Sequence, residues 1–198
     1  MVEIFNQTFW DGHITPRQKQ GEIICLPIRR GTNEPRDLRP ITLRNTEYKI
    51  LARIVAQRLR PVLAKHLKDT QFCGVPGNLI LDAAANIRDI IAFAETEKVP
   101  LCVLSIYFKN AFDNIAHEYL FQTLKRYGIC DPFIHGIMNM YEGASSFVQI
   151  NGHSHGPIPI QCGVRQGCPM GVVLYVLCLQ PFLNFLTGRW QGLRSGTK

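Results

Sequence analysis

The chain has 198 residues, of which 46% are hydrophobic and 19% charged, and its formal net charge is +7. This composition is typical of an ordinary globular chain with enough apolar material for a sizeable core. The seven cysteines are scattered, odd in number and without a CxxC pair. They argue against a disulfide framework or a zinc site and favour reduced thiols in a cytosolic or nuclear protein. Polar and charged residues throughout residues 1–22 exclude a secretory signal, so we do not expect secretion.

Positive charge is concentrated early in the chain. Residues 29–60 carry nine basic side chains against three acidic ones, a local charge of +6. Guanidinium groups pair with phosphate in a bidentate fork, so this segment suits a polyanion. The alternative is a solvated basic helix face. The basic residues are Arg29, Arg30, Arg36, Arg39, Arg44, Lys49, Arg53, Arg58 and Arg60.

The first half of the chain predicts a strand, a loop and two helices. Residues 21–28 favour a strand, and residues 31–40 a loop punctuated by glycine and proline. A helix is expected over about 45–68, with Pro61 splitting or kinking it, and a second helix over about 81–94. The apolar stripe of the first helix comprises Tyr48, Leu51, Val55, Leu59 and Val62, and its polar face carries Lys49, Arg53, Gln57 and Arg60.

The second half predicts a strand at 99–108, then a helix over about 111–127 closed by Gly128. A short helix over 131–141 and a hairpin over 145–162, turning at Asn151-Gly152, follow. The apolar stretch 170–187 reaches only the lower limit of a membrane span, so we expect a buried helix and no membrane. Strands and helices without a regular βαβ rhythm predict an α+β fold.

Three separated stretches carry a family resemblance: LRPITLRNTEYKILARIVAQRLRPVL at 38–63, YFKNAFDNIAHEYLF at 107–121 and INGHSHGPIPIQCGVRQGCPM at 150–170. In this order and spacing they resemble the reverse transcriptase domain of a non-LTR (LINE-type) retrotransposon. The resemblance runs from about residue 21 to about residue 194. It implies one partial domain over 1–198, fingers-like over about 21–98 and palm-like over about 99–194, as in right-hand polymerases.

The resemblance also assigns residues that bind nucleotide and nucleic acid. Arg39 matches the fingers arginine that lies against the incoming nucleotide, with Arg29 or Arg30 as a basic residue before it. Phe112 matches the aromatic gate under the sugar, although a core role is the alternative. The other matched positions are Gln166 and Gly167 in the loop that contacts the nucleotide, with Gly167 alternatively a turn glycine, and Arg165 beside a backbone phosphate. Arg53 and Arg60, from the basic segment, complete the expected nucleic-acid contacts.

One position departs from the family pattern. The family has an Asp, the first ligand of its Mg²⁺ ions, where this chain has Tyr107. A phenol is neutral at neutral pH and offers Mg²⁺ neither charge nor a good oxygen. Asp113 is expected to cap the following helix rather than to replace that ligand. No Asp or Glu follows Glu142 in the sequence, so the Asp-Asp hairpin of the family, like its thumb, is expected to be missing.

We therefore expect no intact catalytic residue, no bound metal and no cofactor in this chain. The leading hypothesis is a truncated, catalytically inactive relative of an RNA-directed DNA polymerase. Its expected partner is RNA or an RNA–DNA hybrid template-primer, while the sequence leaves the oligomeric state open. The alternatives are a non-catalytic RNA- or DNA-binding remnant and a transposon-derived fragment with no function.

Overall fold

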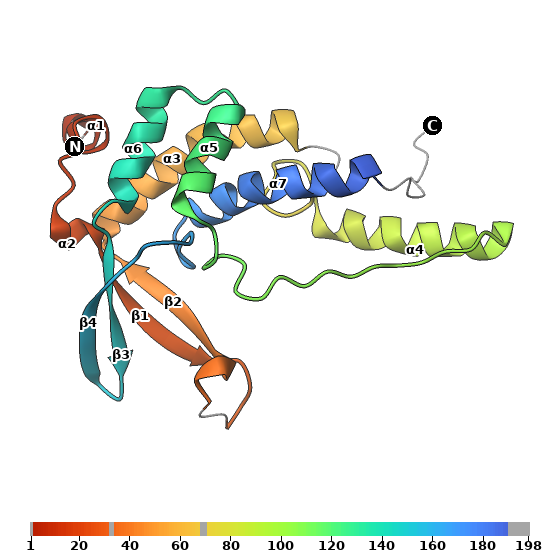
Figure 1. The fold of residues 1–198 in the computed structure, drawn as a ribbon, viewed down its shortest axis with the longest axis horizontal. Helices are drawn as coiled ribbons and strands as arrows, with labels where there is room; N and C mark the ends of the chain where they lie inside the picture. Colours follow the sequence, from red (N-terminus) through yellow and green to blue (C-terminus); the bar gives the residue numbers. More distant parts are fainter. Residues whose placement is uncertain (1, 32–33, 68–70, 190–198) are drawn as a thin grey trace.

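Residues 2–31, 34–67 and 71–189 are described by a computed structural model, in which the helices extend along the long axis and a sheet projects from one side of them (Figure 1). The helices are α1 (Val2–Trp10), α2 (Pro16–Lys19), α3 (Thr46–His66), α4 (Ile80–Glu97), α5 (His117–Arg126), α6 (Asp131–Tyr141) and α7 (Gly171–Arg189). The strands are β1 (Gln20–Pro27), β2 (Leu38–Arg44), β3 (Ser145–Ile150) and β4 (His153–Pro159). The predicted α+β class is confirmed.

The described strands form one mixed sheet in the order β2-β1-β3-β4. β1 pairs with β2 and β3 with β4 in antiparallel fashion, whereas β1 and β3 run parallel. The turn between β3 and β4 has positive φ at Asn151 (50°) and Gly152 (81°), which confirms the predicted hairpin. The sheet takes β1 and β2 from the first half of the chain and β3 and β4 from the second half.

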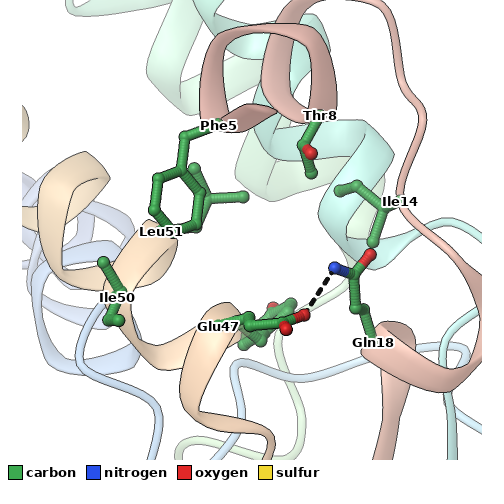
Figure 2. A pocket seen from close by; sticks show the side chains of 8 residues that line it. Phe5, Thr8, Ile14, Gln18, Glu47, Ile50 and Leu51 are labelled. Carbon is green, nitrogen blue, oxygen red and sulfur yellow. Dashed lines mark hydrogen bonds between the residues drawn. The ribbon is translucent and has the colours of Figure 1, made fainter. Parts of the chain in front are cut away.

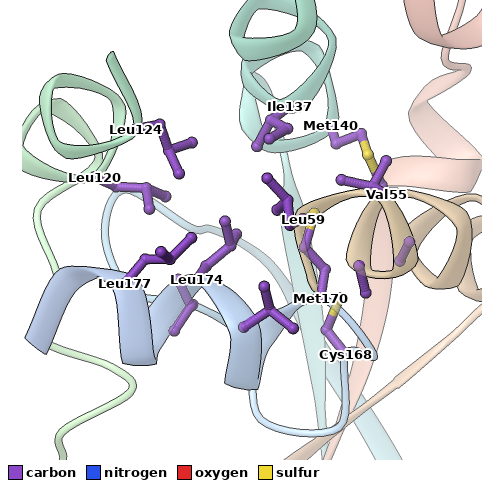
Figure 3. Packing of buried hydrophobic residues seen from close by; sticks show 14 of the residues in the cluster. Val55, Leu59, Leu120, Leu124, Ile137, Met140, Cys168, Met170, Leu174 and Leu177 are labelled. Atoms are coloured by element: carbon purple, nitrogen blue, oxygen red, sulfur yellow. The ribbon is translucent and has the colours of Figure 1, made fainter. Parts of the chain in front are cut away.

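The core lies among α3, α5, α6 and α7 (Figure 3). Apolar residues at helical spacing on α3 face inward because positions three and four apart share one side of a helix. Within the predicted stripe, Val55 and Leu59 are 2% and 1% exposed, while Val62 is partly buried against the core. Leu120 and Leu124 of α5, Ile137 of α6, and Leu174 and Leu177 of α7 are fully buried against them.

Among the described helices, α7 alone has the length and apolar composition of a membrane span, and 39% of that stretch is buried inside the protein. Its first half supplies Leu174 and Leu177 to the core, as the sequence predicts for a buried helix. Its second half leaves Phe182 and Phe185 exposed.

The predicted strand at 99–108 is wrong. Residues 99–108 are neither helix nor strand, and they run as an extended segment from α4 back toward α5 (Figure 1). Val103, Leu104 and Tyr107 are 63%, 67% and 89% exposed. The residues favour strand dihedrals, but a strand also needs a neighbour for its backbone N–H and C=O groups. None of the described strands pairs with this segment.

Other boundaries also differ from the prediction. The helix expected from residue 111 begins at His117, and Ala116 rather than Asp113 is its N-cap residue. The loop expected over 31–40 contains a short 3-10 helix (Pro35–Asp37) and the start of β2. Pro61 does not split α3, which continues to His66. Helices α1 and α2 were not predicted.

Helix α4 is largely exposed. Ile87 and Ile91 are 53% and 38% exposed, and Ala94 is the buried residue of this helix.

Candidate functional site

Residues from the resembling stretches meet at a small cavity of ≈ 210 Å³. The sheet contributes its wall on one side, and the turn before α5 and the loop at 160–166 contribute the other. The lining residues are Ile23, Pro40, Thr42, Asp113, Ile160, Cys162, Gly163, Val164, Arg165 and Gln166.

Backbone hydrogen bonds hold these segments together. The Val164 N–H donates to the Phe112 carbonyl at 2.7 Å, and the Gly163 N–H donates to the Ile115 carbonyl at 2.7 Å. Gly163 has φ +86°, and a Cβ there would lie 2.8 Å from the Asp113 carbonyl oxygen. Glycine is therefore required for the loop to approach the turn this closely.

The same loop also reaches the sheet. The Thr42 N–H, on the free edge of β2, donates to the Gln166 carbonyl at 3.1 Å. At the neighbouring position, Gly167 is exposed, and a Cβ on it would meet the Thr42 carbonyl oxygen at 2.9 Å. The close contact accounts for a glycine at 167.

Asp113 and Gln166 form the polar contact of the cavity. Gln166 Nε2 donates to Asp113 Oδ2 at 3.2 Å, with Oδ1 at 3.5 Å. Burial raises the pKa of the Asp113 carboxyl above its usual value of 3.8, and the hydrogen bond from Gln166 opposes that rise. Reasoning from the sequence missed this pairing because it took Asp113 for a helix cap, although both residues belong to the resembling motifs.

The predicted arginines of the fingers-like part do not join Gln166 at the cavity. Pro40 and Thr42 line the cavity, so the alternation of side chains along β2 places Arg39 on the opposite face, where it is exposed. Arg29 and Arg30 follow the end of β1 and are exposed as well.

Phe112 packs into the helical layer instead of lining the cavity. Its ring stacks on Tyr175, with ring centroids 4.5 Å apart and an interplanar angle of 21°. The side chain is half-buried against the core, which agrees with the core alternative for this residue.

Arg165, predicted beside a backbone phosphate, is instead an interior residue. Its side chain is 5% exposed, its Nε and Nη2 atoms are closed to solvent, and its Nη1 donates to the Lys19 carbonyl at 3.4 Å. A phosphate on the surface would not reach a guanidinium held in this way.

By contrast, the polar face of α3 is open to solvent. Lys49, Arg53, Gln57 and Arg60 are exposed and recur three or four residues apart, which places them on one side of the helix. The first turn contains the acidic residue Glu47, which accepts a hydrogen bond from Gln18. The predicted basic face is therefore present as an accessible surface.

The residues present do not fit a pair of Mg²⁺ ions. Tyr107, at the position of the family's first metal ligand, is 89% exposed, and Asp113 is engaged by Gln166. Over residues 2–31, 34–67 and 71–189, no group of three or more His, Cys, Asp or Glu side chains could hold a metal. All seven cysteines are free thiols.

A separate cavity of ≈ 240 Å³ lies between α1, α2 and α3 (Figure 2). Its wall is mainly apolar, including Phe5, Ile14 and Leu51, and Gln18 donates a hydrogen bond to Glu47 across it at 2.8 Å. It contains none of the residues that the sequence assigns to a site.

Comparison with known proteins points the same way as the motifs. Residues 27–196 match the family described as reverse transcriptase (RNA-dependent DNA polymerase). The chain is 34% identical over 190 residues to the transposon TX1 uncharacterized 149 kDa protein of Xenopus laevis, covering 96% of this chain and 14% of that protein.

Two relatives from Drosophila melanogaster also match. The Pol polyprotein from the type-2 retrotransposable element R2DM is 24% identical, over 94% of this chain and 17% of the relative. The probable RNA-directed DNA polymerase from transposon BS is 26% identical, over 81% of this chain and 18% of the relative. The chain thus spans less than a fifth of each of these three proteins.

Proposed function

Because the chain belongs to the reverse transcriptase (RNA-dependent DNA polymerase) family and is related to the polymerases of non-LTR retrotransposons, we propose that it binds an RNA or RNA–DNA template-primer without extending it. Membership of this family implies binding of a nucleic-acid template. The catalytic inactivity, the absence of a metal cofactor and an intracellular location in cytoplasm or nucleus belong to the proposal.

The exposed basic face of α3 is the observation that carries the binding proposal. Lys49, Arg53 and Arg60 are solvent-accessible on one side of a helix that the core anchors on its other side. A helix held in this way presents cations at fixed spacing, so that they can follow a phosphate backbone. Each phosphate that they neutralise releases condensed counterions, which makes the affinity depend steeply on salt.

Tyr107 is the basis for proposing inactivity. Phosphoryl transfer to a primer uses divalent ions that clamp the attacking and leaving oxygens, and carboxylates must hold those ions. By resemblance, the chain has a tyrosine at the first of those positions, and its motif carboxylate Asp113 accepts a hydrogen bond from Gln166. Loss of one ligand position suffices to explain inactivity, whatever residues another chain could add.

Binding is tested with a fluorescent RNA–DNA hybrid titrated at several salt concentrations. We expect the logarithm of the association constant to fall linearly with the logarithm of salt concentration. Arg53→Gln and Arg60→Gln should each weaken binding and reduce that slope by about 1. Arg88→Gln is the matched control, because Arg88 is an exposed helical arginine already paired with Asp89 at 2.9 Å. Absent binding, or equal effects of all three substitutions, would instead favour a fragment with no function in nucleic-acid binding.

Extension is tested separately with a primed RNA template, deoxynucleotides and either Mg²⁺ or Mn²⁺. We expect no templated product from the wild-type chain. Templated products from it would refute the inactivity without affecting the binding proposal. Tyr107→Asp, measured in parallel, reports whether restoring this carboxylate alone supports extension.

A further inference from the structure

Two buried arginines meet at the C-terminal end of α2. Arg44 and Arg165 are each 5% exposed, although they come from β2 and from the loop before α7. Arg44 Nη1 donates to the Lys19 carbonyl at 2.8 Å, and Arg165 Nη1 donates to the same oxygen at 3.4 Å. Guanidinium groups that reach one carbonyl oxygen are close neighbours, so two positive charges lie together in the interior.

Among the described residues, no carboxylate forms an ion pair with either of these arginines. The pairs of Arg88 with Asp89 and of Lys125 with Asp131 lie elsewhere in the structure. Carbonyl oxygens at the end of α2 supply only partial negative charge. Because burying unpaired ions is strongly unfavourable, an anion beside these arginines would stabilise the folded chain.

Several buried hydrogen-bond donors around the arginines have no partner. They are Arg44 Nε, Arg165 Nε and Nη2, and the Tyr141 hydroxyl. The Tyr48 hydroxyl is also buried, and its side-chain neighbours are Arg44 and Cys168. The ring of Tyr48 lies under the Arg44 guanidinium, with 3.8 Å from Arg44 Cζ to the ring centroid. Tyr141 also lies close enough to interact electrostatically with both Arg44 and Tyr48.

Burial shapes the ionisation of this cluster. Burial lowers the pKa of the Arg44 guanidinium and raises the pKa of the Tyr48 and Tyr141 hydroxyls. The phenols therefore stay protonated as donors at neutral pH and do not neutralise the arginines. The thiol of Cys168 lies beside them, and burial raises its pKa as well.

We propose that Arg44, Arg165, Tyr48 and Tyr141 bind a halide ion, with chloride as the ion available in cells. These four side chains offer two positive charges and several N–H and O–H donors, and none of them is negatively charged. A halide accepts hydrogen bonds from all directions and carries one negative charge. The donors are closed to solvent, which favours a single-atom ion over a phosphate with its larger shape and greater charge.

The test measures the Tm of the purified chain at constant ionic strength while sodium gluconate is replaced by sodium chloride or sodium bromide. An ion that binds the native state alone stabilises it by mass action. We expect the Tm to rise by roughly 3–5 °C for each tenfold increase in chloride above its dissociation constant. Line broadening in ³⁵Cl NMR, reversed by bromide, gives a second readout that does not depend on unfolding.

Variants separate a specific site from general salt effects. Arg44→Met should abolish the chloride dependence, and Tyr141→Phe, which removes only a hydroxyl and keeps the protein folded, should weaken chloride binding roughly tenfold. Arg126→Met, at an exposed arginine of α5, is the control and should respond like wild type. Equal Tm values in gluconate and chloride, or the same response from Tyr141→Phe and wild type, would overturn the proposal and leave buried water as the partner of these donors.

Discussion

The contact between Asp113 and Gln166 joins residues 53 positions apart and fixes the polar side of the cavity. The side-chain amide nitrogen of Gln166 donates to the Asp113 carboxylate, and the backbone carbonyl of Gln166 accepts from the Thr42 N–H. Burial raises the pKa of the Asp113 carboxyl above 3.8. Ionisation of this carboxyl should therefore change the pH dependence of the protein's stability.

Asp113→Asn should change how stability depends on pH. The native state of the wild type binds this proton more tightly than the unfolded state does, because the folded pKa is raised. Wild-type stability is therefore higher below the unfolded pKa and is reduced as pH rises through the folded pKa. Asparagine does not ionise, so the variant does not lose stability in this way as pH rises. Its stability relative to wild type should therefore increase from about pH 3 to about pH 7. Urea unfolding across that range measures the difference.

The control for this experiment is Asp89→Asn, at an exposed aspartate of α4. A difference between Asp113→Asn and wild type that stays constant with pH would contradict the proposed effect of burial on Asp113.

Gly163→Ala should destabilise the loop that forms the cavity. The new Cβ would lie 2.8 Å from the Asp113 carbonyl oxygen, which is backbone, and φ is +86°. Strain and crowding together should lower the free energy of unfolding by about 2–4 kcal/mol. Gly188→Ala in α7 is the control, because a Cβ there meets nothing within 4 Å, and it should not destabilise the protein. Equal stabilities of the two variants in chemical denaturation would show that the loop can move away from the turn.

At the scale of the elements, α3 shows how core packing maintains a helix through a proline, a residue that ordinarily breaks helices. Pro61 lacks the N–H that an interior helical residue donates to the carbonyl four positions earlier, yet the helix continues through it. Buried Leu59 and Leu63 lie on either side of this proline and anchor both turns in the core.

Pro61→Ala should therefore stabilise the protein. Pro61 is exposed, so the substitution removes no core contact and restores a helical hydrogen bond. We expect the free energy of unfolding to rise by about 1–3 kcal/mol, measured by chemical denaturation. An unchanged or lower value would mean that the turn after residue 61 contributes little to the native state.

The elements that sequence reasoning predicted correctly are those with a strong local pattern. The stripe of α3, the Asn151-Gly152 turn and the apolar run of α7 each encode their structure within a short window. The strand at 99–108 was wrong because strand residues alone do not supply a partner. β2 was partly missed because Pro40 and the preceding turn residues suggested a loop, whereas pairing with β1 determines its structure.

The same limit applies to the candidate site. The resembling motifs pointed to the loop with Gln166 and Gly167, but Asp113 was taken for a helix cap, so its contact with Gln166 was missed. The interior position of Arg165 and the stacking of Phe112 on Tyr175 depend on contacts between distant segments. A one-dimensional pattern does not contain those contacts.

At the scale of the whole molecule, the described structure divides into a well-packed helical body with a sheet and a region of exposed apolar residues. Val103, Leu104 and Phe108 in the extended segment are 63%, 67% and 42% exposed, and Ile80 and Leu81 of α4 are 69% and 72% exposed. A chain with this much accessible apolar surface should bind hydrophobic dyes and be prone to self-association.

Limited proteolysis with chymotrypsin should cut first within residues 99–108. Leu104, Tyr107 and Phe108 offer cleavage sites without helix or strand around them. Mass spectrometry of the earliest fragments identifies the bond. Buried Tyr48 and Tyr141 serve as internal controls, because their bonds should resist cleavage until the protein unfolds. First cleavage elsewhere would indicate that this segment has a structural partner in solution.

The parallel pairing of β1 with β3 has a consequence for how the chain acquires its fold. Gln20 pairs with Ser145, so the sheet has a high contact order and cannot close until residue 145 has been synthesised. During translation, the backbone N–H and C=O groups of β1 that later pair with β3 therefore remain without strand partners while the helical segments emerge. A ribosome that pauses before residue 145 would prolong this interval, and the nascent chain would then rely on chaperones to cover that edge of β1.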